Sequence, residues 1–285
     1  MARYIIYTYQ FSPIVSEQKS LFEGTKQSLS EIMSKKQEIF GTIFTNENLM
    51  FKNKSLEYSH KILYNKDNII IFRLANKKYQ NLEENFSITK FEYSPSCLVI
   101  IDNRKNVQHI AIEEDVIAFQ DTNTVANILT QTFSSFLSQH RLQIEIQKEF
   151  QESEFWNLID RYPKGINMVR FEFSYPNLPR VSSSIDKMIS EASKATNSQQ
   201  TIFEFNSAPG SKLAIEKKNR KLSGLAKASA ESGNVITIRA NGYRKHIKTG
   251  HTSKSIEIDN LEILLQSDLI ENATTKIIKE LNKIK

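Results

Sequence analysis

The amino-acid sequence predicts an α/β protein of the α+β kind, with a β-rich N-terminal half and a C-terminal half of alternating strands and helices on a mixed sheet. Two observations lead to this prediction. Short runs of β-branched and aromatic residues recur before residue 120, whereas after residue 141 such runs alternate with segments of helical periodicity. The 285 residues, 39% hydrophobic and 25% charged, have the composition of a folded protein with room for one large or two small domains.

Apolar runs bounded by turn-forming residues indicate the strands of the N-terminal half. The continuous run Ile69-Ile70-Ile71-Phe72 indicates a buried strand, and the polar stretch 102–106 indicates a hairpin turn. The predicted strands lie at residues 4–11, 68–75, 88–93, 97–101 and 107–113.

Three other segments of this half have different patterns. Residues 16–44 fit one broken helix, or a helix followed by a strand, and residues 45–66 fit a loop or hairpin. Residues 122–139 have helical spacing of their apolar side chains, which predicts an amphipathic helix capped at Asp121 or Thr122. The apolar positions are Val125, Ile128, Leu129, Phe133, Phe136 and Leu137.

The C-terminal half alternates between strand-like and helix-like segments. Strands are predicted at 142–148, 166–174, 201–205 and 234–240, the last with a hairpin partner at Ile247 or at 253–258. Helices are predicted at 153–161, 184–196 and 217–231, and from a cap at Asp259 or Asn260 to about Lys283.

The change of pattern predicts a domain boundary near residue 141. A β-rich domain would occupy residues 1–141, with the helix at 122–139 closing it or belonging to the other side. An α/β domain would occupy residues 142–285 and contain the basic segment 211–254. The alternative is one continuous sheet built from both halves.

Positive charge is concentrated in the basic segment, residues 211–254. It contains eleven Lys/Arg against Glu216 and Glu231, while the rest of the chain contains 27 Lys/Arg against 30 Asp/Glu. Five of the eight glycines also lie within residues 210–250. Glycine allows close approach of a backbone, and clustered backbone N–H groups bind phosphate oxygens. A localised positive field of this kind favours a polyanionic partner.

We therefore expect a non-enzymatic protein that binds the phosphate backbone of DNA or RNA. Tyr243 would stack on a base if its ring is exposed. Residues Lys217, Arg220 and Lys221 would share one face of a helix, where a bound phosphate would offset their repulsion. The predicted nucleic-acid-binding residues are Lys212, Lys217, Lys218, Arg220, Lys221, Lys227, Arg239, Tyr243, Arg244, Lys245, His246, Lys248 and Lys254.

Two alternative functions remain open at this point. A nuclease would use Glu172 and Glu204, flanked by Phe on neighbouring strands, to hold a divalent metal, or His246 and His251 as acid and base. An interaction module would instead place the basic face against an acidic protein partner, and the chain would also be free to assemble with copies of itself.

Other classes of function have no support in the sequence. Phosphate-loop, nucleophile-elbow and dinucleotide-binding motifs are absent, so no cofactor is predicted. Cys97 lies in an apolar run and is expected to be buried. No apolar run approaches the length needed to cross a bilayer, and the N-terminus does not read as a signal peptide. We expect a cytoplasmic protein of a general type found in bacterial phage-defence and mobile-element systems.

Overall fold

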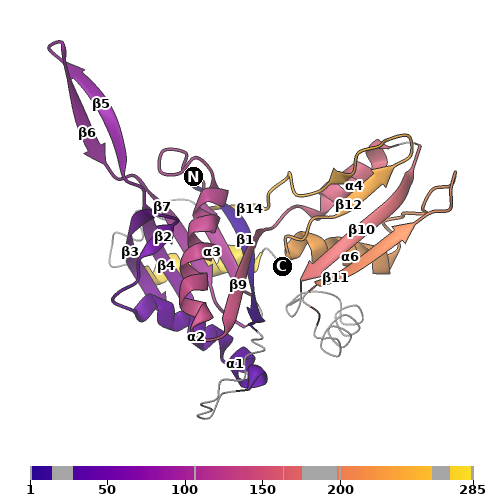
Figure 1. Ribbon diagram of the computed structural model, residues 1–285, viewed down its shortest axis with the longest axis horizontal. Helices are drawn as coiled ribbons and strands as arrows, with labels where there is room; N and C mark the ends of the chain where they lie inside the picture. Colours follow the sequence, from indigo (N-terminus) through magenta and orange to yellow (C-terminus); the bar gives the residue numbers. More distant parts are fainter. Residues whose placement is uncertain are drawn as a thin grey trace. The chain divides into compact units, whose positions relative to one another are not determined.

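The computed structural model describes residues 2–14, 28–105, 107–162, 164–174, 198, 200–258 and 270–283. The fold is α+β, as the sequence predicts (Figure 1). The chain divides into two compact units. The first unit comprises Met1–Ile6, Pro13–Ile146 and Ser255–Lys285, and the second comprises Tyr7–Ser12 and Gln147–Lys254.

The larger sheet has eight strands. They are β1 (Ala2–Pro13), β2 (Phe51–Asn53), β3 (Leu56–Lys66), β4 (Ile69–Ala75), β7 (Ser96–Asp102), β8 (His109–Glu113), β9 (Leu142–Lys148) and β14 (Ser255–Ile258). Their order is β14-β1-β8-β7-β4-β3-β2, and β9 also pairs with β1. The segment 45–66 is thus the hairpin β2–β3, and the strands predicted at 4–11, 68–75, 97–101 and 107–113 are confirmed.

Helices pack on both faces of this sheet. The helical elements are α1 (Leu29–Ser34), α2 (Lys36–Thr42), the 3-10 turn η1 (Ile43–Thr45), α3 (Thr122–Ser138) and α8 (Ile270–Asn282). On one face Phe40, Phe72 and Phe133 belong to an aromatic cluster with α2 and α3. On the other, Ile69 and Ile71 pack with Ile277 of α8. Because alternate residues of β4 face opposite helices, its apolar run is continuous.

Local signals explain the ends of two helices. The side chain of Asp121 accepts a hydrogen bond from the backbone N–H of Asn123, which confirms the predicted cap of α3. Ser28 and Glu31 form a capping box at the start of α1. Residues 29–45 form two short helices and a 3-10 turn, which corresponds to the broken-helix alternative for that part of 16–44.

A separate hairpin extends from the first unit. Its strands β5 (Lys78–Glu84) and β6 (Ser87–Tyr93) form a two-stranded sheet, drawn in Figure 1 as an arm away from the larger sheet. The sequence predicts β6 but misses β5, because the polar segment Lys78–Glu84 has no apolar alternation to mark it.

The second unit has a four-stranded sheet with helices on one face. Its elements are α4 (Glu152–Arg161), β10 (Ile166–Ser174), β11 (Gln200–Asn206), α6 (Arg220–Glu231), β12 (Thr237–Ala240) and β13 (Ile247–Lys248). The order is β11-β10-β12-β13, antiparallel at all three pairings, so it is more uniform than the predicted mixed sheet. Phe155 of α4, Phe171 of β10 and Ala226 of α6 meet in its core.

The end of the chain returns to the first unit. Strand β14 pairs with β1, from Ala2 opposite Ile258 to Ile5 opposite Ser255, whereas β13 is the hairpin partner of β12. The predicted division into residues 1–141 and 142–285 places Ser255–Lys285 in the second domain, whereas this segment belongs to the first unit. The helix predicted at 184–196 and the cap at Asp259 or Asn260 lie outside the described residues.

Candidate nucleic-acid interface

The side chain of Asn241 connects three loops at one end of the second unit's sheet. Its Nδ2 donates hydrogen bonds to the carbonyl oxygens of Lys164, at 3.1 Å, and Ser211, at 3.2 Å. Its Oδ1 accepts from Asn167 Nδ2 at 2.9 Å. We call these loops together the loop cluster; it comprises residues 164–165, 211–213 and 241–246.

The same hydrogen bonds gather cationic side chains. Arg239 Nε donates to Asn167 Oδ1 at 2.8 Å, which connects this arginine to Asn241. The aliphatic stem of Lys212 passes over Gly165, where an added Cβ would lie 2.7 Å from Lys212 Cδ. Gly165 also has φ +85°, so both its backbone and the room that Lys212 occupies require glycine.

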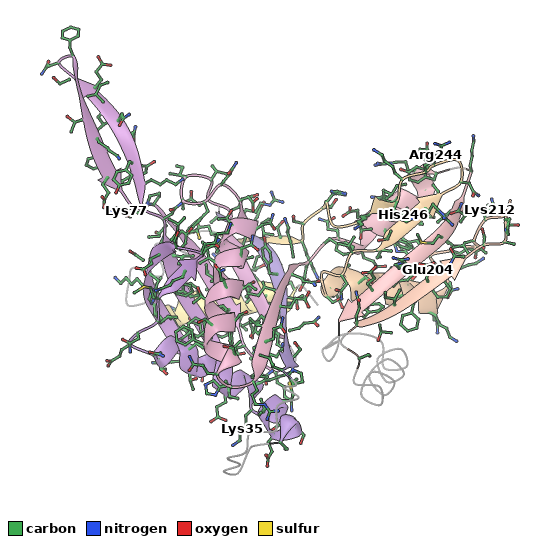
Figure 2. The ribbon with its side chains drawn as sticks, viewed as in Figure 1. Lys35, Lys77, Glu204, Lys212, Arg244 and His246 are labelled. Atoms are coloured by element: carbon green, nitrogen blue, oxygen red, sulfur yellow. The ribbon has the colours of Figure 1, made fainter. Side chains whose placement is uncertain are left out.

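The tip of the loop cluster presents an aromatic ring next to cations. Tyr243 is 56% exposed, and its ring forms a T-shaped contact with the ring of Tyr162, with 5.0 Å between ring centroids. Arg244, Lys245 and His246 follow it and are exposed. Figure 2 shows Arg244, His246 and Lys212 with their side chains on the surface of the second unit. A ring that is supported by a neighbouring ring and more than half exposed can stack on a base.

Most cations of the basic segment are exposed and are not used in ion pairs with described acidic residues. Within the described ranges, eight share this property: Lys212, Lys217, Arg220, Lys221, Arg239, Arg244, Lys245 and Lys248.

Three predicted binding residues are engaged with acids. Lys218 Nζ lies 2.9 Å from Glu216, and Lys227 Nζ lies 3.7 Å from Glu231. Lys254 Nζ lies 3.2 Å from Glu149 Oε2, and that carboxylate is completely buried. The Lys254 backbone N–H also donates to the Glu149 carbonyl oxygen at 3.0 Å. Lys254 therefore neutralises a buried charge inside the second unit.

The helix expected at 217–231 starts later than the sequence indicates. Asn219 is its N-cap, and Asn219 Oδ1 accepts from the backbone N–H groups of Lys221 and Leu222. Lys217 and Lys218 precede the helix, so the predicted shared face of Lys217, Arg220 and Lys221 does not form within it. Because the cap satisfies two of the first amides, α6 does not need a phosphate at this end.

Arg170 separates the two glutamates considered as metal ligands. Arg170 Nη2 lies 2.6 Å from Glu204 Oε2, and Arg170 Nη1 lies 3.8 Å from Glu172 Oε1. Hydrogen bonds from Asn206 and Arg170, followed by the charges of Arg170 and Arg239, hold the pKa of the Glu204 carboxyl below its usual value. In the part of the chain that the structure describes, no three His, Cys, Asp or Glu side chains are grouped to hold a metal ion.

The two histidines considered as acid and base lie before and after β13 in the sequence. His246 precedes Ile247 and is exposed, whereas the His251 backbone N–H donates to Glu154 Oε1 at 3.0 Å. Glu154 also accepts from the backbone N–H of Thr252 at 2.9 Å, so it anchors this loop to α4. The interactions found among the described residues include no contact between the two imidazoles.

Sequence reasoning missed Lys164, Asn167 and Asn241. The Asn241-Gly242 dipeptide signals a turn between strands, and Gly242 has φ +85°. The bonds from Asn241 to residues 77 and 30 positions away leave no local pattern.

None of the helices described is long and apolar enough to span a bilayer. Neither a comparison with known protein families nor one with curated proteins found a match for this chain.

Proposed function

We propose that the second unit binds the phosphate backbone of DNA or RNA through the loop cluster and the exposed cations beside it, without catalysing a reaction. The observation that carries the proposal is the set of hydrogen bonds at the Asn241 side chain. It donates to Ser211, the residue before Lys212, and accepts from Asn167, which itself accepts from Arg239, so separate cations are gathered at one end of a sheet. A rigid arrangement of cations loses less entropy on binding phosphates than independent side chains would.

Charge and aromatic chemistry support the same proposal. Lys212, Arg239, Arg244, Lys245 and Lys248 are exposed and form no ion pair with a described acidic residue, so each is available to neutralise a phosphate, although the charge of Arg239 also acts on Glu204. The exposed ring of Tyr243 adds a platform for an unpaired base. The proposal does not use Lys254, which neutralises Glu149, and it does not depend on the cap of α6.

The test measures binding of labelled single-stranded and duplex DNA and RNA by fluorescence anisotropy over a range of salt concentrations. Five to seven engaged cations predict a slope of log K against log[salt] of roughly −5 to −6 on duplex DNA. The triple variant Lys212→Gln, Arg244→Gln, Lys245→Gln should bind more weakly and reduce the slope by about 3.

A matched control removes three exposed lysines of the first unit, in the variant Lys61→Gln, Lys66→Gln, Lys279→Gln. It changes the net charge by the same amount and should leave the slope unchanged. Equal loss in both variants, or no binding at low salt, would reject the proposal. The second result would favour an acidic protein partner for the same cations.

The proposal extends to a cytoplasmic location and to a role as a subunit of a bacterial phage-defence or mobile-element system. That extension rests on the general type of the chain, an α+β protein with one basic segment.

A further inference from the structure

The hairpin β5–β6 exposes apolar side chains along its strands and in its turn. Phe86 is 100% exposed and Ile88 is 70% exposed, while Tyr79, Leu82 and Phe91 are about half exposed. Isolated exposed apolar residues are common, but five on one 16-residue hairpin are a concentration typical of interaction sites. Tyr79 and Ile88 lie on one face of the hairpin and Leu82 and Phe91 on the other, while Phe86 lies in the turn between the strands. The two strands pair only with each other in the described structure, and an isolated hairpin of this size is only marginally stable in water.

The turn of the hairpin holds Phe86 in a backbone conformation that disfavours it. Asn85 has φ 50° and Phe86 has φ 62°, so both central residues of this two-residue turn are left-handed. Asn-Gly is the preferred pair for such a turn. A fully exposed phenylalanine in the place that suits glycine stabilises neither the turn nor a core. A ring placed in this way is suited to insertion into another surface.

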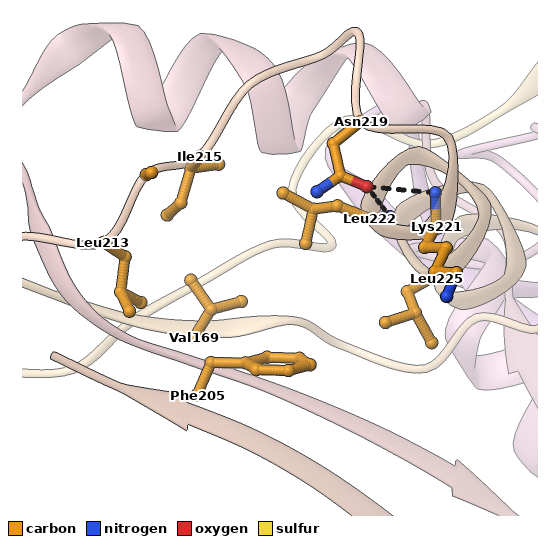
Figure 3. A pocket seen from close by; sticks show the side chains of 9 residues that line it. Val169, Phe205, Leu213, Ile215, Asn219, Lys221, Leu222 and Leu225 are labelled. Atoms are coloured by element: carbon orange, nitrogen blue, oxygen red, sulfur yellow. Dashed lines mark hydrogen bonds between the residues drawn. The ribbon is translucent and has the colours of Figure 1, made fainter.

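The second unit contains an apolar pocket of about 300 Å³ between β10, β11 and the start of α6 (Figure 3). The volume is at the lower end of the range for ligand pockets and suits an aromatic side chain with a neighbour. The pocket is not suited to phosphate, and the proposed nucleic-acid interface does not account for it. Its apolar lining includes Val169, Phe205, Leu213, Ile215, Leu222 and Leu225.

The charges around the two surfaces are complementary. In the hairpin, Glu83 lies opposite Ile88 in the register, and Glu84 follows it in the sequence. Lys221 lines the pocket, and Lys217 and Arg220 are exposed nearby in the chain without an ion pair to a described acid. An acidic, aromatic tip therefore matches an apolar pocket with a basic rim.

We infer that the β5–β6 tip of one copy of the chain inserts Phe86 into the β10–β11–α6 pocket of a second copy. The contact joins two different surfaces, so every copy offers one tip and one pocket. Such head-to-tail contacts produce closed rings or open chains of subunits. The inference goes beyond nucleic-acid binding. The cations that it uses lie beside α6 and outside the loop cluster, of which only Leu213 lines the pocket.

The test uses one variant for each surface, in protein freed of nucleic acid by nuclease and high salt. Phe86→Asn removes the aromatic ring and should keep the turn, because Asn accepts left-handed φ. Ala214→Trp fills the pocket from an exposed position on its lining. In sedimentation velocity, wild type should assemble with increasing concentration. Each variant alone should associate at least about tenfold more weakly, since a buried aromatic anchor carries much of such a contact.

Mixing the two variants distinguishes this contact from other modes of association. The Ala214→Trp copy still has a tip and the Phe86→Asn copy still has a pocket, so an equal mixture should form a complex of two chains and nothing larger. The control Val116→Asn removes another exposed apolar side chain, 70% exposed and outside the hairpin, and should assemble like wild type.

Three results would overturn the inference: a wild type that stays monomeric, a Phe86→Asn variant that still assembles, or a mixture that gives no complex of two chains. Assembly that survives Ala214→Trp would point to pairing of hairpin edges instead. If Ala214→Trp proves unfolded by circular dichroism, Lys221→Glu replaces it, and a mixture of Lys221→Glu with Glu83→Lys should recover the association that each loses. Anisotropy should show that Phe86→Asn binds nucleic acid like wild type.

Discussion

Arg170 on β10 and Glu204 on β11 lie directly opposite each other in the antiparallel register, and two guanidinium nitrogens of Arg170 each lie 2.6 Å from Glu204 Oε2. Glu172, two residues along β10, lies on the same face of the strand and is the second acid near that guanidinium, at 3.8 Å. The positive charge of Arg170 already neutralises the negative charge of these carboxylates that a divalent cation would otherwise balance.

The first prediction follows from this arrangement. The variants Glu172→Gln and Glu204→Gln should unfold at nearly the same urea concentration as wild type, because partly exposed ion pairs contribute little. Neither wild type nor variants should cut a labelled oligonucleotide with Mg²⁺ or Mn²⁺. Gel analysis of the oligonucleotide provides the measurement. Metal-dependent cleavage by wild type that disappears in either variant would establish a nuclease centre instead.

The second prediction concerns Lys254, which the sequence indicates as a binding residue but which pairs with the buried Glu149. Lys254→Met should lower the free energy of unfolding by about 3 kcal/mol, because it leaves a buried carboxylate without its cation. Lys248→Met, at an exposed position of the same segment, should change it by less than about 0.5 kcal/mol. Urea denaturation gives both values.

A double variant provides the control for Lys254. Adding Glu149→Gln to Lys254→Met removes the uncompensated charge and should recover part of the lost stability. If the two substitutions were simply additive, the 3.2 Å contact would not be the cause of the loss.

The third prediction separates base stacking from phosphate binding. Tyr243→Ala should weaken binding of a single strand by about 1–3 kcal/mol, the usual contribution of one base stacked on an aromatic ring. Duplex binding should change little, because stacked base pairs do not offer an open face. Tyr243→Phe keeps the ring and should bind like wild type. Anisotropy at one fixed salt concentration suffices, and equal losses for both nucleic acids would contradict a stacking role.

The fourth prediction concerns the buried Lys36 at the start of α2. Burial, and secondarily the charge of Lys105, lowers the pKa of this ammonium to about 8. An unfolded lysine titrates near 10.4, so between these values the unfolded chain binds more protons and stability increases with pH. The contribution of Lys36 is least favourable below pH 8 and improves as the pH rises toward 10.

The measurement compares wild type with Lys36→Met by urea denaturation at pH 7 and pH 10. The free energy of unfolding of wild type, relative to the variant, should rise by about 2 kcal/mol over this interval. Lys35→Met serves as the control, because it removes an exposed neighbouring lysine. A difference that stays constant with pH for Lys36→Met would show that the lysine is not desolvated.

Local patterns in the sequence were sufficient to predict most strands, the helix α3 and the concentration of cations. Helical spacing from Val125 to Leu137 and the cap at Asp121 both arise within a few residues. The run Ile69–Phe72 is continuous because both faces of β4 are covered, which its apolar character already indicates. Charge in residues 211–254 is a property of the composition itself.

Only the tertiary structure decided which residues lie together. The pairing of β14 with β1, the ion pair of Lys254 with Glu149 across 105 positions, and the connection of Lys164 and Ser211 by Asn241 join distant parts of the chain. Arg170 likewise meets Glu204 only because β10 and β11 adopt one particular register. Local propensity and periodicity describe single segments, whereas pairing and burial depend on how the whole chain closes around its cores.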